Sequence, residues 1–285
     1  MLAPLGRPIR PAVGTIPAAP TVLIDLATRE GVVGRSYLFA YTPPAVAPLV
    51  LLLRALGEEL AGRALLPREI QRHLDRRFRL LGTQGLLGMA LGGLDMAIWD
   101  ALARAAELPL VSLLGGTASA LPAYDSYGMV DPVADAKVLR ASVEAGFEAI
   151  KIKLGGGDLA QDLATVAAVR EIIGPATRLM VDYNQSLAVA EARRRIAALA
   201  PFDLTWVEEP VANEDLQGHA RVRAGSPIPI QTGENWWFPR GMAEAVAAGA
   251  SDLAMLDVMK IGGVTGWLAA AAQAGAAGLP VSSHI

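Results

Sequence analysis

Six ionisable residues stand at the ends of six strand-like apolar segments, at nearly regular intervals along the second half of the chain. They are Lys153, Asp182, Glu208, Glu234, Asp257 and His284, and the successive gaps are 29, 26, 26, 23 and 27 residues. A strand, a helix and two connecting loops need roughly this length, and a parallel (β/α)₈ barrel repeats that unit. Because the carboxyl ends of its strands face one opening, the six side chains are predicted to meet in one pocket.

The first part of the chain follows a different pattern. Residues 20–40 read as two strands joined by a glycine-containing turn. From residue 44 to about 110, apolar residues recur three and four positions apart, which is typical of helices. We therefore predict an α/β chain with a small α+β domain over residues 1–115 and a (β/α) barrel domain over residues 116–285. The segment 8–16 is rich in turn-forming residues and is expected to form a flap.

The predicted barrel domain has seven strands, counted from residues 123–128 to the segment that carries His284. Seven parallel strands leave two open edges with unpaired backbone groups. The eighth unit is then absent, supplied by another chain or lost by truncation, and we favour truncation after strand seven.

Composition excludes several classes of function. The formal charge of −3 provides no basic surface for nucleic acid or anionic membranes, and the lack of cysteine excludes disulfides and thiol chemistry. Prolines interrupt the N-terminus where a signal peptide needs an apolar run. No uninterrupted apolar stretch reaches the roughly 18 residues of a membrane span. We expect a cytoplasmic protein that binds neither nucleic acid nor membrane.

Three of the strand-end residues are carboxylates, which points to a metal ion. Asp182, Glu208 and Glu234 would supply hard oxygen ligands from three consecutive strands, and such ligands suit Mg²⁺ better than zinc. Carboxylates at strand ends can instead cap helix N-termini, but three in matching positions favour the metal. Glu208 and Glu209 are expected to point to opposite faces of their strand, and the residues alone do not settle which one faces the metal.

Two candidate bases flank these carboxylates. Lys151 and Lys153 share one face of a strand, although only four of the 25 basic residues are lysines. Neighbouring ammonium groups are expected to lower each other's pKa, so one of the two becomes a candidate base, with Lys151 assigned to anion binding. Asp257 and His284 end adjacent strands, so the carboxylate is expected to fix the imidazole tautomer and raise the basicity of its other nitrogen.

A base on each side of a metal suits the removal of a proton α to a carboxylate. The dianionic intermediate needs a divalent cation and hydrogen-bond donors on its oxygens. Because a second base can return the proton to the opposite face, the arrangement of residues indicates racemisation.

Several segments, taken in order, carry a family resemblance: VLIDLAT, GVVGRSYLFAYTP, AYDS, KIK, VDYNQS, WVEEP, GENW, MKIGGVTGW and SSH. The chain resembles the mandelate racemase and muconate-lactonising branch of the enolase superfamily over nearly its whole length. The resemblance implies a (β/α)₈-type barrel with an N-terminal capping domain, whose first strand is expected to be absent here. It also implies an Mg²⁺-dependent racemase that acts on mandelate or a similar 2-hydroxy carboxylate through an enediolate.

By this resemblance, the Mg²⁺ ligands are Asp182, Glu208 and Glu234, which selects Glu208 over Glu209. Lys153 matches the base that acts on the (S)-enantiomer. His284, paired with Asp257, matches the base that acts on the (R)-enantiomer.

The resemblance also implies the substrate contacts. Lys151 and Ser126 match groups that hold the substrate carboxylate, and Asn184 matches a contact to the α-hydroxyl. Tyr41 and the segment 8–16 match loops that close over an aromatic ring. The family has a further glutamate on the eighth strand, which no residue of this chain matches.

Two alternative functions stay open. A sugar-acid dehydratase of the same superfamily uses similar lysine and histidine–aspartate bases, and an inactive fragment would bind metal or carboxylates without turnover. Apolar residues of the flap and nearby loops favour an aromatic substrate over a polyol: Ile9, Val13, Ile16, Leu38, Phe39 and Tyr41. The resemblance further implies a homo-oligomer with a small-molecule substrate.

Overall fold

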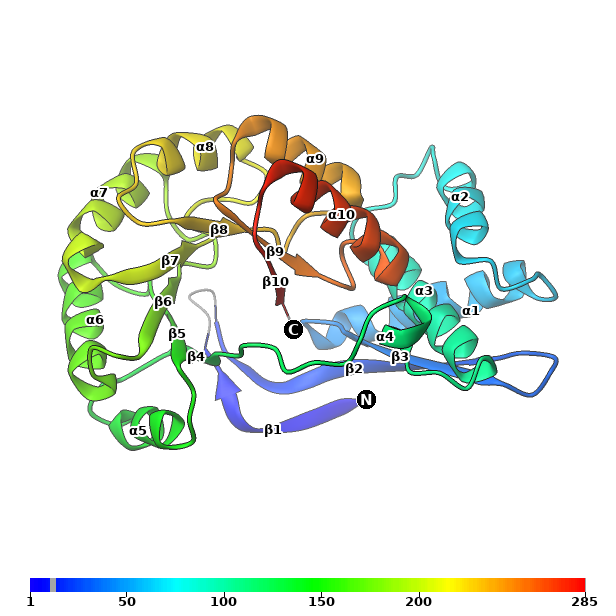
Figure 1. The fold of residues 1–285 in the computed structure, drawn as a ribbon, viewed down its shortest axis with the longest axis horizontal. Coiled ribbons are helices and arrows are strands. Elements are labelled where there is room, and N and C mark those ends of the chain that lie inside the picture. Colours follow the sequence, from blue (N-terminus) through cyan, green and yellow to red (C-terminus); the bar gives the residue numbers. More distant parts are fainter. Residues whose placement is uncertain (11–13, 285) are drawn as a thin grey trace.

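The computed structural model describes residues 1–10 and 14–284, which form a small α+β region and a curved parallel sheet covered by helices (Figure 1). The predicted boundary near residue 116 falls in the connection between these two regions. The first region contains β1 (Leu2–Ile9), β2 (Ile16–Ala27), β3 (Val33–Phe39), the 3₁₀ turn η1 (Pro43–Ala45), α1 (Val46–Leu60), α2 (Pro67–Arg77), α3 (Leu86–Ala105) and α4 (Leu110–Leu113).

The three strands of the first region form one antiparallel sheet in the order β1-β2-β3. Alternate side chains point to opposite faces, so Val22 and Leu38 are buried against the helices while Leu23 and Tyr37 are exposed. Leu38 is therefore a core residue of this region and not part of a substrate-facing loop.

Helix α3 is the core helix of the first region. It is long and apolar enough to cross a membrane by length and composition, but 67% of its most apolar window is buried inside the protein. Asp95 on α3 also reaches the second region, where it accepts hydrogen bonds from the Thr265 backbone N–H at 2.9 Å and the Thr265 hydroxyl at 2.6 Å. Because Thr265 lies in the first turn of a helix, this contact caps the helix and joins the two regions.

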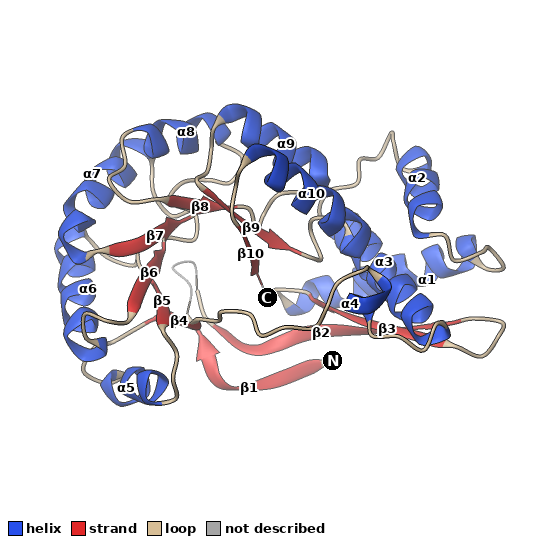
Figure 2. Ribbon diagram, in the orientation of Figure 1, coloured by secondary structure: helices blue, strands red, loops and turns tan. Residues whose placement is uncertain are grey.

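The second region alternates strands and helices (Figure 2). Its elements are β4 (Asp125–Met129), α5 (Ala136–Glu144), β5 (Ala149–Lys153), α6 (Leu159–Ile173), β6 (Arg178–Asp182), α7 (Val189–Leu199), η2 (Ala200–Phe202), β7 (Leu204–Glu208), α8 (Leu216–Ala224), β8 (Ile230–Thr232), α9 (Phe238–Ala248), β9 (Leu253–Asp257), α10 (Gly263–Ala277) and β10 (Val281–His284). The seven strands are parallel in the order β10-β9-β8-β7-β6-β5-β4, which confirms the predicted barrel-type sheet of seven strands. The helices follow the outer side of the curved sheet.

The strand register places the predicted site residues side by side. Lys153 lies opposite Asp182, Asp182 opposite Glu208, and Asp257 opposite His284. Ile152, between the two lysines of β5, is fully buried in the core that the strands share with the helices. Because side chains alternate along a strand, the lysines point to the concave side of the sheet.

The structure corrects the prediction for the N-terminus. The sequence predicts only two strands there, but Leu2–Ile9 forms β1, with Leu2 opposite Pro20 and Ile9 opposite Ile16. Pro4 is compatible with a strand here because β1 is at the edge of the sheet, where a missing N–H is tolerated. The predicted flap overlaps the ends of β1 and β2, and its residues 11–13, including Val13, lie outside the described residues.

The close packing of α3 on β3 gives a stability prediction. A Cβ added at Gly34 would lie 2.0 Å from the Ala97 carbonyl oxygen and 2.7 Å from the Ala101 Cβ. We expect Gly34→Ala to lower the free energy of unfolding by about 3 kcal/mol, because helix and strand must separate. Urea denaturation followed by circular dichroism measures this change.

Gly57→Ala is the matched control. Gly57 lies within α1, and a Cβ there would meet nothing within 4 Å. This substitution should raise the free energy of unfolding by up to about 1 kcal/mol through helix propensity. Equal stability of Gly34→Ala and the wild type would contradict the close packing of α3 on β3.

Candidate active site

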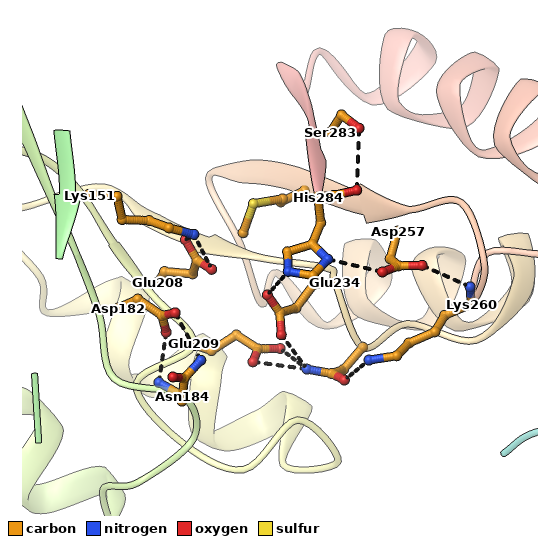
Figure 3. Close-up of polar contacts among 12 residues, drawn as sticks. Lys151, Asp182, Asn184, Glu208, Glu209, Glu234, Asp257, Lys260, Ser283 and His284 are labelled. Atoms are coloured by element: carbon orange, nitrogen blue, oxygen red, sulfur yellow. Dashed lines mark hydrogen bonds and ion pairs between the residues drawn. The ribbon is translucent and has the colours of Figure 1, made fainter. Parts of the chain in front are cut away.

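Residues from β5 to β10 meet at the carboxyl ends of the strands (Figure 3). Five carboxylates, here called the carboxylate cluster, are buried there: Asp182, Glu208, Glu209, Glu234 and Asp257. Three lysines share the site, namely Lys151, Lys153 and Lys260. With His284 neutral, five negative and three positive groups leave a formal charge of −2.

Burial and mutual repulsion raise the pKa of two carboxylates in this cluster, Glu208 and Glu209. For Glu208, burial is the largest cause, the charge of Asp182 adds to it, and Lys151 only partly opposes them, so the pKa rises to about 8. Burial and the charge of Glu234 raise the pKa of Glu209 well above its usual value. The positive groups of the site therefore do not balance the negative charge of its carboxylates at neutral pH.

Each lysine of β5 forms an ion pair with a carboxylate. Lys151 Nζ donates to both Glu208 oxygens at 2.9 and 2.7 Å, and Lys153 Nζ donates to Asp182 Oδ2 at 2.5 Å. The predicted mutual lowering of the lysine pKa values is wrong for Lys151. Burial lowers its pKa, but the charges of Glu208 and Asp182 outweigh burial and raise it. Lys153 pairs with the cluster because the strand register sets Asp182 beside it, whereas the side chain of Lys151 reaches Glu208 two strands away.

Glu208 and Glu209 both face the site, contrary to the prediction that they point to opposite faces. Glu208 is the last residue of β7, and Glu209 follows it with a positive φ of 37°. The strand alternation therefore ends at Glu208, and the left-handed backbone turns the Glu209 side chain toward Asn235 and Gln185.

His284 and Asp257 form the predicted contact. His284 Nδ1 lies 2.9 Å from Asp257 Oδ2, and Asp257 Oδ1 accepts the Met259 N–H at 2.7 Å. His284 Nε2 also lies 3.0 Å from Glu234 Oε2. Burial lowers the pKa of His284, but the hydrogen bond to Asp257 and the charge of Glu234 outweigh burial and raise it.

Each of the three predicted metal ligands forms an ion pair with a basic side chain in this structure. Within residues 1–10 and 14–284, no group of three or more histidine, cysteine, aspartate or glutamate residues has the geometry of a metal site. Instead, Asp182 contacts Lys153, Glu208 contacts Lys151, and Glu234 contacts His284. The predicted ligands nonetheless offer only carboxylate oxygens, and the formal charge of −2 of the whole site fits one divalent cation.

The predicted substrate contacts lie around this cluster. Ser126 on β4 is in register with Lys151. Asn184 donates its backbone N–H to Asp182 Oδ1 at 2.7 Å and its side-chain amide to Asp182 Oδ2 at 2.8 Å. Its buried Oδ1 has no hydrogen-bond partner among the described residues. The buried Tyr41 hydroxyl likewise has no partner within residues 1–10 and 14–284, and burial with the charge of Asp257 raises its pKa. Tyr41 and Asn184 both have left-handed backbones, with φ of 58° and 43°.

Sequence reasoning missed Asn235, Lys260 and the role of Glu209. Asn235 donates to both Glu209 oxygens at 2.8 and 2.9 Å and accepts from Lys260 Nζ at 2.5 Å. The scarcity of lysine and the position of Lys260 three residues after Asp257 were the available signals. The positive φ of Glu209 has no such signal in the sequence.

Two family models match the chain. The mandelate racemase / muconate lactonizing enzyme N-terminal domain matches residues 2–115, and the enolase C-terminal domain-like model matches residues 134–285.

Solved and curated relatives agree with these matches. A crystal structure of an enolase from Bradyrhizobium, complexed with magnesium and mandelic acid, is 58% identical with a TM-score of 0.97, and the match covers 100% of this chain and 79% of that one. The D-galactarolactone cycloisomerase of Agrobacterium fabrum is 37% identical over 85% of this chain and 65% of its own length. The L-talarate/galactarate dehydratase of Salmonella typhimurium is 34% identical over 66% of this chain and 48% of its own length. The chain thus spans about half to two thirds of these two curated relatives.

The contact between His284 and Asp257 gives a pH-dependent prediction. Because the folded protein raises the pKa of His284, the contact stabilises the fold below the unfolded pKa of about 6.5, and this contribution is lost as pH rises through the folded pKa. In Asp257→Asn, the amide oxygen can keep the Met259 backbone bond while the amide nitrogen faces Nδ1. The pKa of His284 should fall, and the stability difference from the wild type should be largest near pH 5, above the usual range for carboxylates.

Proton NMR of His284 and urea denaturation in chelator-treated protein measure both effects. Asp25→Asn is the control, because Asp25 is exposed and pairs with Arg35 far from this contact in the sequence. An unchanged His284 pKa in Asp257→Asn would show that the contact does not control this imidazole.

Proposed function

The chain belongs to the mandelate racemase and muconate lactonizing enzyme family of the enolase superfamily, and we propose that it is an Mg²⁺-dependent racemase of mandelate or a similar 2-hydroxy carboxylate. One observation carries this proposal: two candidate bases, Lys153 on β5 and His284 on β10, flank a buried carboxylate cluster that, together with the three lysines of the site, has a formal charge of −2. The presence of magnesium and mandelic acid in the Bradyrhizobium structure supports it.

Asp182, Glu208 and Glu234 would hold the magnesium ion. When bound, the cation supplies positive charge that stabilises the negative charge developing on the substrate carboxylate. Lys151, buried beside Glu208, would add a second positive group for that carboxylate. Ser126, in register with Lys151, would donate its hydroxyl to it.

Lys153 and His284 would exchange the α-proton from two sides. Lys153 contacts Asp182 and His284 contacts Glu234, and both carboxylates belong to the proposed Mg²⁺ ligands. If these carboxylates bound Mg²⁺ instead, the two basic side chains would be released to act as bases. Asp257 holds His284 Nδ1 and thereby directs Nε2 toward the cluster and the substrate. The Oδ1 atom of Asn184, which has no partner in the part of the chain that the structure describes, can accept a hydrogen bond from the α-hydroxyl of the substrate.

Aromatic side chains from the first region favour an aromatic substrate. The rings of Phe39 and Tyr41 pack 4.9 Å apart, and the Phe39 backbone N–H reaches the Met259 sulfur after β9 at 3.3 Å. Sugar-acid dehydration is the second candidate, because the Salmonella typhimurium relative carries out that class of reaction. The homo-oligomeric state and the cytoplasmic location stay predictions.

The proposed metal set is tested by Glu234→Gln. We expect the affinity for Mg²⁺ alone, measured by calorimetry, to fall by at least about 100-fold, since even outer contacts of a metal site contribute about 10–100-fold. The circular dichroism spectrum should stay unchanged. Glu244→Gln is the matched control, because Glu244 lies exposed on α9 and pairs with Arg240. Equal Mg²⁺ affinities of Glu234→Gln and the wild type would place the metal elsewhere.

The two bases are tested by exchange of the α-proton of mandelate in D₂O with Mg²⁺. Each single variant should lose racemisation, because one proton donor or acceptor is missing, but should keep exchange on the face of the remaining base. Lys153→Ala should retain exchange of the (R)-enantiomer, and His284→Asn that of the (S)-enantiomer.

Lys137→Ala is the control for this experiment, because Lys137 is exposed on α5. Loss of exchange for both enantiomers in both variants would favour two bases that act together, as in dehydration. A wild-type protein that exchanges neither enantiomer would overturn the racemase proposal.

A further inference from the structure

Lys260 is a buried cation that the proposed reaction does not use. Lys260 lies three residues after the end of β9, and it is 6% exposed. In the described part of the chain, its ammonium group contacts no carboxylate directly; it donates to Asn235 Oδ1 at 2.5 Å and lies 4.6 Å from the centre of the Tyr41 ring. A buried ammonium needs such partners, because removal from water is strongly unfavourable.

The contact with Lys260 fixes the orientation of the Asn235 amide. A lysine ammonium can only donate hydrogen bonds, whereas an asparagine amide has one accepting and one donating end. Lys260 therefore holds the oxygen of Asn235 on its own side, and the Asn235 amide nitrogen must point the other way.

The amide nitrogen of Asn235 then holds two carboxylates. It donates to Glu209 at 2.8 and 2.9 Å and to Glu234 Oε1 at 3.2 Å. Gln185 adds a second donor to Glu209 at 3.1 Å. If the amide flipped, its oxygen would face two carboxylates, which is strongly repulsive in a buried site.

Tyr41 covers the other side of Lys260. The tyrosine comes from the first region of the fold, so the ammonium is enclosed between that region and the carboxyl end of the sheet. Exclusion of water strengthens the bond from Lys260 to Asn235 because the local dielectric constant is lower.

We propose that Lys260 is a positioning residue that orients the Asn235 amide and, through it, holds Glu209 and Glu234 in place for the cation. This inference rests on the proposed function only in its last step, the binding of Mg²⁺. The orientation of Asn235 is a property of the protein without metal, and it is tested separately.

The first experiment is a double-mutant cycle with Mg²⁺ alone as the probe, measured by calorimetry without substrate. Lys260→Met and Asn235→Ala should each weaken Mg²⁺ binding by at least about tenfold. Because Lys260 acts through Asn235, the double variant should bind no more than about twofold more weakly than Asn235→Ala. Lys137→Met, which removes an exposed lysine, should bind like the wild type.

The second experiment uses the side-chain amide signal of Asn235 in metal-free protein, assigned by its loss in Asn235→Ala. In Lys260→Met, the two amide protons should exchange with solvent at least about tenfold faster than in the wild type. This readout separates the two proposals: a wild type that fails to bind Mg²⁺ contradicts the proposed function, and the amide signal still tests Lys260.

Two results would overturn the role of Lys260. Unchanged exchange of the Asn235 amide in Lys260→Met would show that the lysine does not hold it. Independent losses of Mg²⁺ affinity, with the double variant weaker by the product of the two single effects, would show that Lys260 acts by its charge alone.

Discussion

Repulsion among buried carboxylates is the interaction on which the site depends. The parallel register sets Asp182 beside Glu208, and the next strands add Glu234 and Asp257 to the same buried end of the sheet. No fold can hold such a group ionised unless positive charge stands close by. The lysines of β5 and the enclosed Lys260 provide three positive charges, and with the imidazole of β10 neutral the site is still two positive charges short. This deficit of positive charge makes the site electrostatically unfavourable without a metal ion. For the same reason, the site should strongly favour binding of a divalent cation.

Much of this arrangement could be predicted from the sequence, because a parallel sheet converts spacing into proximity. Strand-end residues that repeat about once per βα unit must meet at one edge, so the sequence alone places Lys153, Asp182 and Glu208 together. The pair of Asp257 and His284 follows in the same way from two adjacent strands. These inferences need only the order of the strands and the direction in which they run.

The remaining features depend on contacts that spacing does not specify. The pKa of Lys151 rises because its side chain reaches the carboxylate of Glu208, two strands away, and not because of its own strand. Glu209 faces the site because its backbone leaves the strand conformation, which side-chain alternation cannot predict. Strand β1 forms despite its prolines because the neighbouring strand offers it an edge. Each of these features is decided by a partner distant in sequence or by a single backbone angle.

Four side chains around the site share that backbone angle. Tyr41, Asn184, Gln185 and Glu209 all have positive φ, between 37° and 65°, although none is glycine. A left-handed conformation is unfavourable for such residues by roughly 1 kcal/mol or more each. Glycine at any of these positions would relieve the backbone and remove the functional side chain in one step. At these four positions the protein therefore trades stability for the side chains of the site. Stabilising substitutions are best sought elsewhere in the chain.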